Sequence, residues 1–191
     1  MSTAGDSGLP KWSQSLISEL ESADRRAEVL AKGLSDEQMN WQPLPGAWSI
    51  AQCIEHVHVA NEVYLPAIAA ALDGHPQTKV EELWSGWPSR WFIRNFIAPN
   101  PGGTRAKAPK KIEPASHVDP GVVSRFLRSN QTAMELVRRA SLFDVNSIRF
   151  KNPFVPLLRF TVGTGLEIVA KHQSRHLLQA ENVRQSAGFP S

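Results

Sequence analysis

The sequence predicts an all-α protein, a four-helix bundle with a long irregular crossover between its second and third helices. Two observations predict this class. Apolar residues recur at helical spacing in four segments of the 191-residue chain, and no stretch shows the strong alternation that is typical of strands. A chain of this length suits one domain, so we expect residues 1–191 to form a single bundle, with a Trp-rich segment and a basic loop inserted at about 75–118.

The first predicted helix covers residues 11–34. Its apolar residues recur every three or four positions with charges between them, and Gly33 can take the left-handed conformation that ends a helix. Residues 35–38, with the sequence SDEQ, have the pattern of a capping box and predict a short turn.

The second predicted helix runs from Ser49 to about Leu72. Ser49 is a favourable N-cap, and Gln52, three residues later, completes a capping box. Trp48, just outside the helix, is expected to pack on Cys53 as a hydrophobic staple.

The crossover contains two contrasting stretches. The first, residues 84–96, is rich in Trp and Phe, and Pro88 is expected in the first turn of a short helix. The aromatic residues could pack on the bundle, cover a pocket or form a subunit interface. The second stretch is rich in proline, glycine and basic residues and predicts a solvated loop; its basic residues are Arg105, Lys107, Lys110 and Lys111.

The last two long helices are predicted downstream of the crossover. Asp119 is expected to be the N-cap of the third, with Pro120 at its first position. Residues 150–160 predict an extended or turn segment, and the fourth helix is expected over about 162–187.

Composition narrows the classes of function. The net charge is only +3, and the basic residues are mostly scattered among acidic ones, so we expect no nucleic-acid partner. No apolar run approaches the roughly 18 residues of a membrane span, so we expect no membrane association. Cys53 is the only cysteine, which excludes an intrachain disulfide, and the first residues lack the pattern of a signal peptide. The expected location is cytoplasmic.

Helical geometry separates the histidines of the second helix. At about 100° per residue, His58 shares an arc with Glu55 and Glu62 and is expected to face solvent. His56 lies on the opposite side with Val59 and is expected to be buried.

The fourth helix carries two inward histidines. His172 and His176 lie about 40° apart on one face, and Gly165 on the same face is expected to leave space above them. Histidines at i and i+4 can share a metal ion, and a third histidine from a neighbouring helix would leave one position open for water. Spacing alone does not show that His56 reaches this pair, and three separate core histidines bonded to protein atoms remain the alternative.

Two motifs carry a family resemblance. Pro-Gly-Ala-Trp-Ser at 45–49 is followed by a histidine eight residues after Trp48, and the late His-x-x-x-His is followed by Leu and Gln. Together they resemble the DinB/YfiT superfamily, particularly its DinB-like subgroup, over about 9–74 and 120–187. The resemblance implies a four-helix bundle that binds a divalent metal near one end. The implied ligands are His56, His172 and His176.

The resemblance also implies a range of reactions. The family includes thiol-dependent transferases, a maleylpyruvate isomerase that acts with low-molecular-weight thiols, and proteins described only as metal-dependent hydrolases. We therefore expect a divalent-metal-dependent enzyme acting on a small molecule, thiol-dependent S-transferase-like or hydrolase-like. Transfer is slightly favoured, because no inward carboxylate is available as a general base. A non-catalytic metal- or ligand-binding bundle protein is the alternative, and a bundle that binds no metal is a third reading.

The sequence leaves open which metal is bound, which residues support the site and whether the chain forms a dimer. Zinc, nickel, iron and manganese all accept imidazole ligands, so the metal is not identified. Gln179, Arg175 and Cys53 are candidates for supporting the ligands or contacting the substrate, with ordinary packing or surface pairing as the alternative. A homodimer formed through apolar helix faces is also open.

Overall fold

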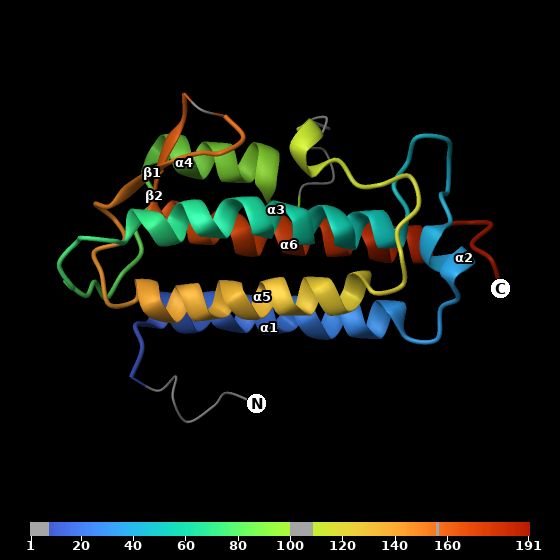
Figure 1. Cartoon of the computed structure of the whole chain (residues 1–191), viewed down its shortest axis with the longest axis horizontal. Coiled ribbons are helices and arrows are strands. Elements are labelled where there is room, and N and C mark those ends of the chain that lie inside the picture. Colours follow the sequence, from blue (N-terminus) through green and yellow to red (C-terminus); the bar gives the residue numbers. More distant parts are fainter. Residues whose placement is uncertain (1–7, 100–108, 156) are drawn as a thin grey trace.

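The computed structural model describes residues 8–99, 109–155 and 157–191. Four long helices lie side by side in a bundle (Figure 1). They are α1 (Lys11–Ala31), α3 (Ile50–Ala71), α5 (Val122–Ala140) and α6 (Val162–Arg184). A short helix, α2 (Asp36–Asn40), lies between α1 and α3. The predicted all-α four-helix bundle is confirmed.

The order of the helices explains the long crossover. α3 packs against α5 and α6, and α1 packs against the same two helices. α3 and α5 run in the same direction (Figure 1), so the chain must return along the whole bundle between them. The returning segment carries α4 (Trp87–Phe92), a π-helical turn η1 (Ile93–Ile97) and a 3₁₀ turn η2 (Lys110–Ile112).

Only part of the predicted basic loop is described. Lys110 and Lys111 are exposed in η2, as expected. Arg105 and Lys107 lie outside the described residues.

Local sequence signals set most helix starts. The capping box predicted at Ser49 and Gln52 is present, with each side chain bonded to the other residue's backbone N–H. α5 differs, since it begins at Val122 and not at Pro120. Asp119 accepts a hydrogen bond from the Gly121 N–H at 2.8 Å, which makes a turn that delays the helix by two residues.

A short hairpin joins α5 to α6. Its strands, β1 (Arg149–Lys151) and β2 (Arg159–Thr161), are antiparallel, with Phe150 opposite Phe160. Three residues are too few for an alternating pattern to stand out, so the sequence indicated only an extended segment. A Cβ on Gly165 would lie 2.6 Å from Phe150 Cε1. Gly165 therefore leaves space for the hairpin and not, as predicted, for the histidines.

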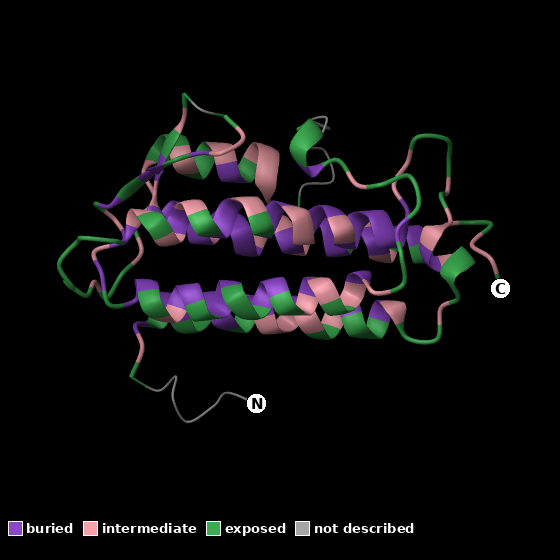
Figure 2. Ribbon diagram, viewed as in Figure 1, coloured by how far each residue is buried: buried purple, intermediate pink, exposed green. Residues whose placement is uncertain are grey.

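Buried residues lie along the long helices (Figure 2), and the apolar ones form two clusters. One cluster surrounds Tyr64, Ile68 and Phe150 toward the hairpin, and the other surrounds Cys53 and Phe126 toward α2. Both are built from the inward faces of the long helices. The residues between them on α3 and α6 are more polar, and the three predicted ligands lie there.

A buried network of polar side chains joins α1, α5 and α6. Asn130 of α5 donates to the Leu20 carbonyl at 2.9 Å and to Asp24 Oδ1 at 2.7 Å, both on α1. Gln173 of α6 donates to Asn130 Oδ1 at 2.8 Å. Burial raises the pKa of the Asp24 carboxyl to about 6.

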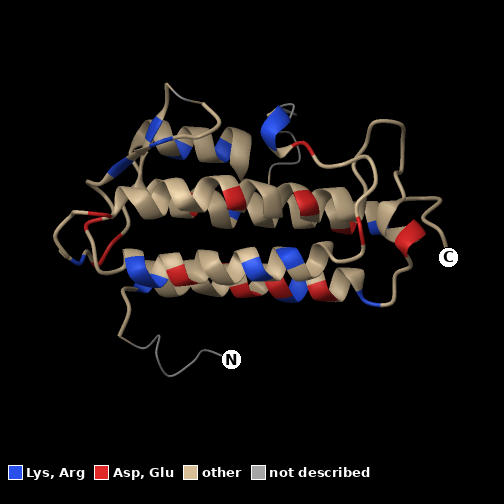
Figure 3. Ribbon diagram, in the orientation of Figure 1, with Lys and Arg blue, Asp and Glu red and all other residues tan. Residues whose placement is uncertain are grey.

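Charged residues of both signs are mixed along α1 and α5 (Figure 3). In the part of the chain that the structure describes, no helix is long and apolar enough to cross a membrane.

Candidate metal centre

Three histidine rings from two helices meet between the core clusters. His56 lies on α3, and His172 and His176 lie one turn apart on α6. Their ring centroids are 4.9 Å apart for His56 and His172, 4.5 Å for His56 and His176, and 4.6 Å for the α6 pair. The structure thus brings the predicted trio together. On α3 and α6 it lies next to residues of both core clusters.

Hydrogen bonds fix which nitrogens face the shared space. His56 Nδ1 lies 2.7 Å from the carbonyl oxygen of Ile112, which can only accept, so this nitrogen carries the proton. His176 Nδ1 likewise lies 3.1 Å from Gln179 Oε1 and donates to it. In both neutral rings the Nε2 lone pair is therefore left for another partner.

The geometry fits a small cation. His56 Nε2 and His172 Nε2 are 3.2 Å apart, and one ligand atom from each of the three histidines falls within a group spanning 4.8 Å. Two nitrogens on one tetrahedral zinc, each at about 2.05 Å, would be about 3.3 Å apart. The bonds from Nδ1 to Ile112 and Gln179 are of the kind that orients imidazoles in known metal sites. Among the described residues, this is the group of His, Cys, Asp or Glu side chains that could hold a metal ion.

The histidines are suited to binding as neutral ligands. Burial lowers the pKa of His56 and His176, and it lowers the pKa of His172 to about 3. The neighbouring rings and the positive charge of Arg175 act in the same direction. All three imidazoles are therefore uncharged at neutral pH, which is the form of histidine that binds a metal ion.

A cavity of about 320 Å³ opens beside the histidines. Trp48 lies against the cluster, with its ring 4.7 Å from that of His56 and 5.6 Å from that of His176. Trp48 therefore packs at a tilt against two of the histidine rings, and it also packs against the core cluster that contains Cys53, as the sequence had predicted. Phe92 and Phe96 of the crossover line the cavity, while Trp84 and Trp87 are exposed. The Phe residues of the Trp-rich insert thus form part of the cavity wall.

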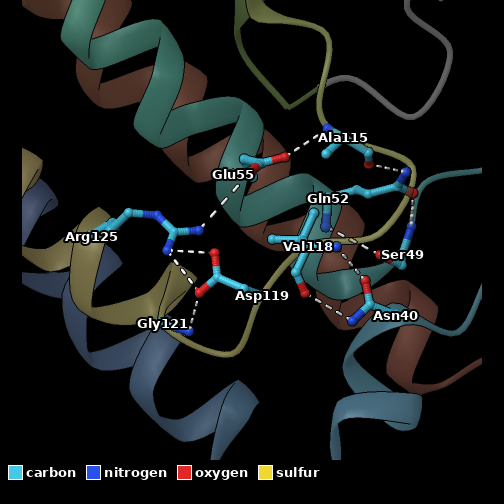
Figure 4. A network of polar contacts seen from close by, with 9 residues as sticks. All are labelled: Asn40, Ser49, Gln52, Glu55, Ala115, Val118, Asp119, Gly121 and Arg125. Atoms are coloured by element: carbon cyan, nitrogen blue, oxygen red, sulfur yellow. Dashed lines mark hydrogen bonds and ion pairs between the residues drawn. The ribbon is translucent and has the colours of Figure 1, made fainter.

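The crossover is fastened to α3 next to the site. The Ala115 N–H donates to Glu55 Oε2 at 2.7 Å, and Gln52 Nε2 donates to the Ala115 carbonyl at 2.8 Å (Figure 4). These bonds hold the segment that supplies the Ile112 carbonyl to His56. Glu55, expected to be solvated, is half-buried because it performs this task.

The other sequence candidates separate into two groups. Gln179 contacts His176, and Arg175 lines the cavity and donates to the Phe96 carbonyl at 2.9 Å. Cys53 is fully buried in the core cluster toward α2, and burial raises the pKa of its thiol. It is not part of the histidine group. His58 is half-buried and not solvent-facing as predicted.

Sequence reasoning missed most of the cavity wall. Ile112 acts through its backbone carbonyl, which carries no sequence signal. Asn61, Tyr64 and Asn152 also line the cavity, from α3 and from the loop after β1. Asn61 and Tyr64 follow His56 on the same helix, so a search of the inward positions after His56 would have found them.

Comparisons with known proteins agree with this fold. Bacillus subtilis YfiT, described as a probable metal-dependent hydrolase with an unusual four-helix bundle topology, superposes with a TM-score of 0.61 at 14% identity, covering 93% of this chain and 89% of YfiT. A conserved protein from Enterococcus faecalis gives a TM-score of 0.53 at 18% identity, covering 92% and 96% of the two chains.

Sequence comparison gives the family. The Bacillus subtilis (strain 168) protein YuaE is 22% identical over 161 residues, which cover 81% of this chain and 88% of YuaE. Residues 19–180 match the sequence profile of the DinB superfamily. Because this match spans most of the bundle, the chain belongs to the DinB superfamily.

Proposed function

We propose that the chain is a divalent-metal-dependent enzyme acting on a small molecule, with His56, His172 and His176 as the metal ligands. The observation that carries the proposal is the convergence of the three rings beside a cavity, with two Nε2 atoms 3.2 Å apart. When bound, a divalent cation polarises a substrate oxygen or lowers the pKa of a coordinated water or thiol. The description of YfiT as a probable metal-dependent hydrolase supports metal-dependent chemistry in this fold.

We favour thiol-dependent transfer over hydrolysis, with a low-molecular-weight thiol as the second cofactor. Hydrolysis needs a general base that takes a proton from water. None of the described residues that line the cavity is Asp or Glu, and the three histidines are occupied as ligands in this proposal. A thiol ionises more readily than water, so transfer depends less on such a base.

Metal content tests the first half of the proposal. Protein purified without an affinity tag should contain about one equivalent of a divalent metal by elemental analysis, and His172→Ala should lose it. His58→Ala is the matched control, because His58 is a half-buried histidine of α3 that does not line the cavity. If wild-type protein reloaded with zinc, nickel, iron or manganese retains none of them, the metal proposal is wrong.

Measurements of turnover test the second half of the proposal, which concerns the type of reaction. A panel of low-molecular-weight thiols with electrophilic substrates, and a parallel panel of esters and amides, should give metal-dependent product only with the thiols. Product from the esters without thiol would favour the hydrolase. Stoichiometric metal with no turnover in either panel would favour a non-catalytic metal- or ligand-binding protein.

A further inference from the structure

The cavity beside the histidines is mainly apolar. Its volume of about 320 Å³ is about twice the 150 Å³ that holds benzene in a protein interior. It therefore has room for one ring and a short chain. The aromatic and aliphatic side chains of its wall come from the loop before α3, from α3, from the crossover, from the hairpin loop and from α6. They include Trp48, Tyr64, Phe92, Phe96, Phe154 and Ile168.

The charge that the described residues bring to the cavity is positive. Arg175 is the one charged side chain among the described lining residues, and no Asp, Glu or Lys is among them. Its guanidinium is positioned by the bond to the Phe96 carbonyl, and its charge acts on all three histidines. With a divalent cation on three neutral imidazoles, the formal charge of the site becomes +3, the cation contributing two charges and Arg175 one. Positive charge that lines a mainly apolar cavity attracts the anionic group of a ligand.

We propose that this cavity binds a small organic anion with an apolar, ring-sized body, and that Arg175 selects the anion over its neutral analogue. The proposal rests on the proposed function, since the cation held by the histidines supplies two of the three charges. The apolar body lies against the Phe side chains of the crossover and the hairpin loop, and the anionic group lies at the end where Arg175 and the histidines meet. Arg175 is thus a specificity-determining residue.

A matched set of probes tests both parts of the proposal. 4-Phenylbutyrate carries a ring and a charge, 4-phenylbutyramide keeps the ring without the charge, and butyrate keeps the charge without the ring. Calorimetric titration of zinc-loaded protein should show 4-phenylbutyrate binding about tenfold or more tightly than either analogue, because an offset buried charge and a buried phenyl group each contribute more than about 1.4 kcal/mol.

Two substitutions assign the charge preference. Arg175→Gln should reduce the preference of acid over amide to less than about threefold while leaving the zinc content unchanged, and Arg175→Lys should retain part of it. Arg94→Gln removes the same charge from an exposed position of η1 that does not line the cavity, so it should keep the wild-type preference.

Three results would overturn the proposal: equal binding of acid and amide, an unchanged preference in Arg175→Gln, or no binding of any probe at millimolar concentration. Failure of the metal proposal is seen separately, as absent zinc in elemental analysis. The same titrations on metal-free protein then still show whether the preference depends on Arg175.

Discussion

Gln179 provides a two-way test of the metal centre, because it touches His176 through the nitrogen that faces away from the shared space. Its Oε1 accepts a hydrogen bond from the Nδ1–H group of His176 at 3.1 Å. Gln179→Ala removes this acceptor and frees the ring to rotate or change tautomer. Gln179→Glu keeps an acceptor in the same place and adds a negative charge. We expect the first substitution to weaken metal binding and the second to strengthen it.

The expected magnitudes follow from the geometry. Loss of an outer hydrogen bond to a metal-binding histidine costs about 10- to 100-fold in metal affinity, or about 1.4 to 2.7 kcal/mol. For Gln179→Glu, the path from the carboxylate across the ring to a cation is about 7 Å, given about 2 Å from Nε2 to the metal. At that distance the attraction is about 1 kcal/mol in water and about 5 kcal/mol at an effective dielectric constant of 20. Gln179 is half-buried, so we expect a value near the lower limit, about tenfold tighter binding.

Competition against a chromogenic zinc chelator at pH 7 measures both effects. Gln185→Ala is the control, because Gln185 is an exposed glutamine at the end of the same helix. Equal zinc affinity in wild type, Gln179→Ala and Gln179→Glu would refute the reasoning, as would a shift of both variants in the same direction.

Three further predictions concern stability. The pKa of Asp24 is about 6 in the folded protein and 3.8 without burial, so the folded state binds the extra proton, and the free energy of unfolding should fall as pH rises from about 4 to 6. Asp24→Asn should remove this dependence and raise the free energy of unfolding by about 1 kcal/mol at pH 7, after allowance for solvent screening. Urea titrations at several pH values measure both effects. If the free energy of unfolding of the variant falls with pH in parallel with that of the wild type, the prediction is wrong. Gly165→Ala should lower the free energy of unfolding by about 1 to 2 kcal/mol, because the clash with the Phe150 ring outweighs the gain in helix propensity. In the double variant, Phe150→Leu should restore part of this loss. A stabilised Gly165→Ala would show that the ring moves aside. Tyr64→Phe should stabilise by about 1 kcal/mol in thermal or urea unfolding, since the buried Tyr64 hydroxyl has no partner among the described residues, and a loss of stability would reveal one.

The sequence predicted the parts of this protein that depend on helical periodicity and local capping. The spacing of apolar residues identified the four long helices, and Ser49 with Gln52 marked the start of α3 correctly. The same periodicity placed His56, His172 and His176 on inward faces, where the structure has them. That these residues bind metal remains a prediction.

Contacts between distant segments were beyond the sequence. Glu55 was placed on a solvated arc because the pattern of α3 alone does not show that the Ala115 N–H donates a hydrogen bond to Glu55. Gly165 was assigned to the histidines because the sequence did not show that Phe150 of the hairpin occupies that space. Both errors have one physical cause, since a helical wheel shows the faces of one helix and not the distant segments that pack against them.

The topology of the bundle links the crossover to the chemistry of the site. Two parallel helices, α3 and α5, require a connection that runs back along the bundle (Figure 1), and described residues of this connection line the cavity beside the histidines. It supplies the Ile112 carbonyl that sets the tautomer of His56, and the Phe side chains that close the cavity. A bundle with only short connections would place the same three rings together but would leave them open to water and with His56 free to turn. The insert therefore determines both the protonation of a predicted ligand and the apolar character of its surroundings, which are the two properties on which the proposed chemistry depends.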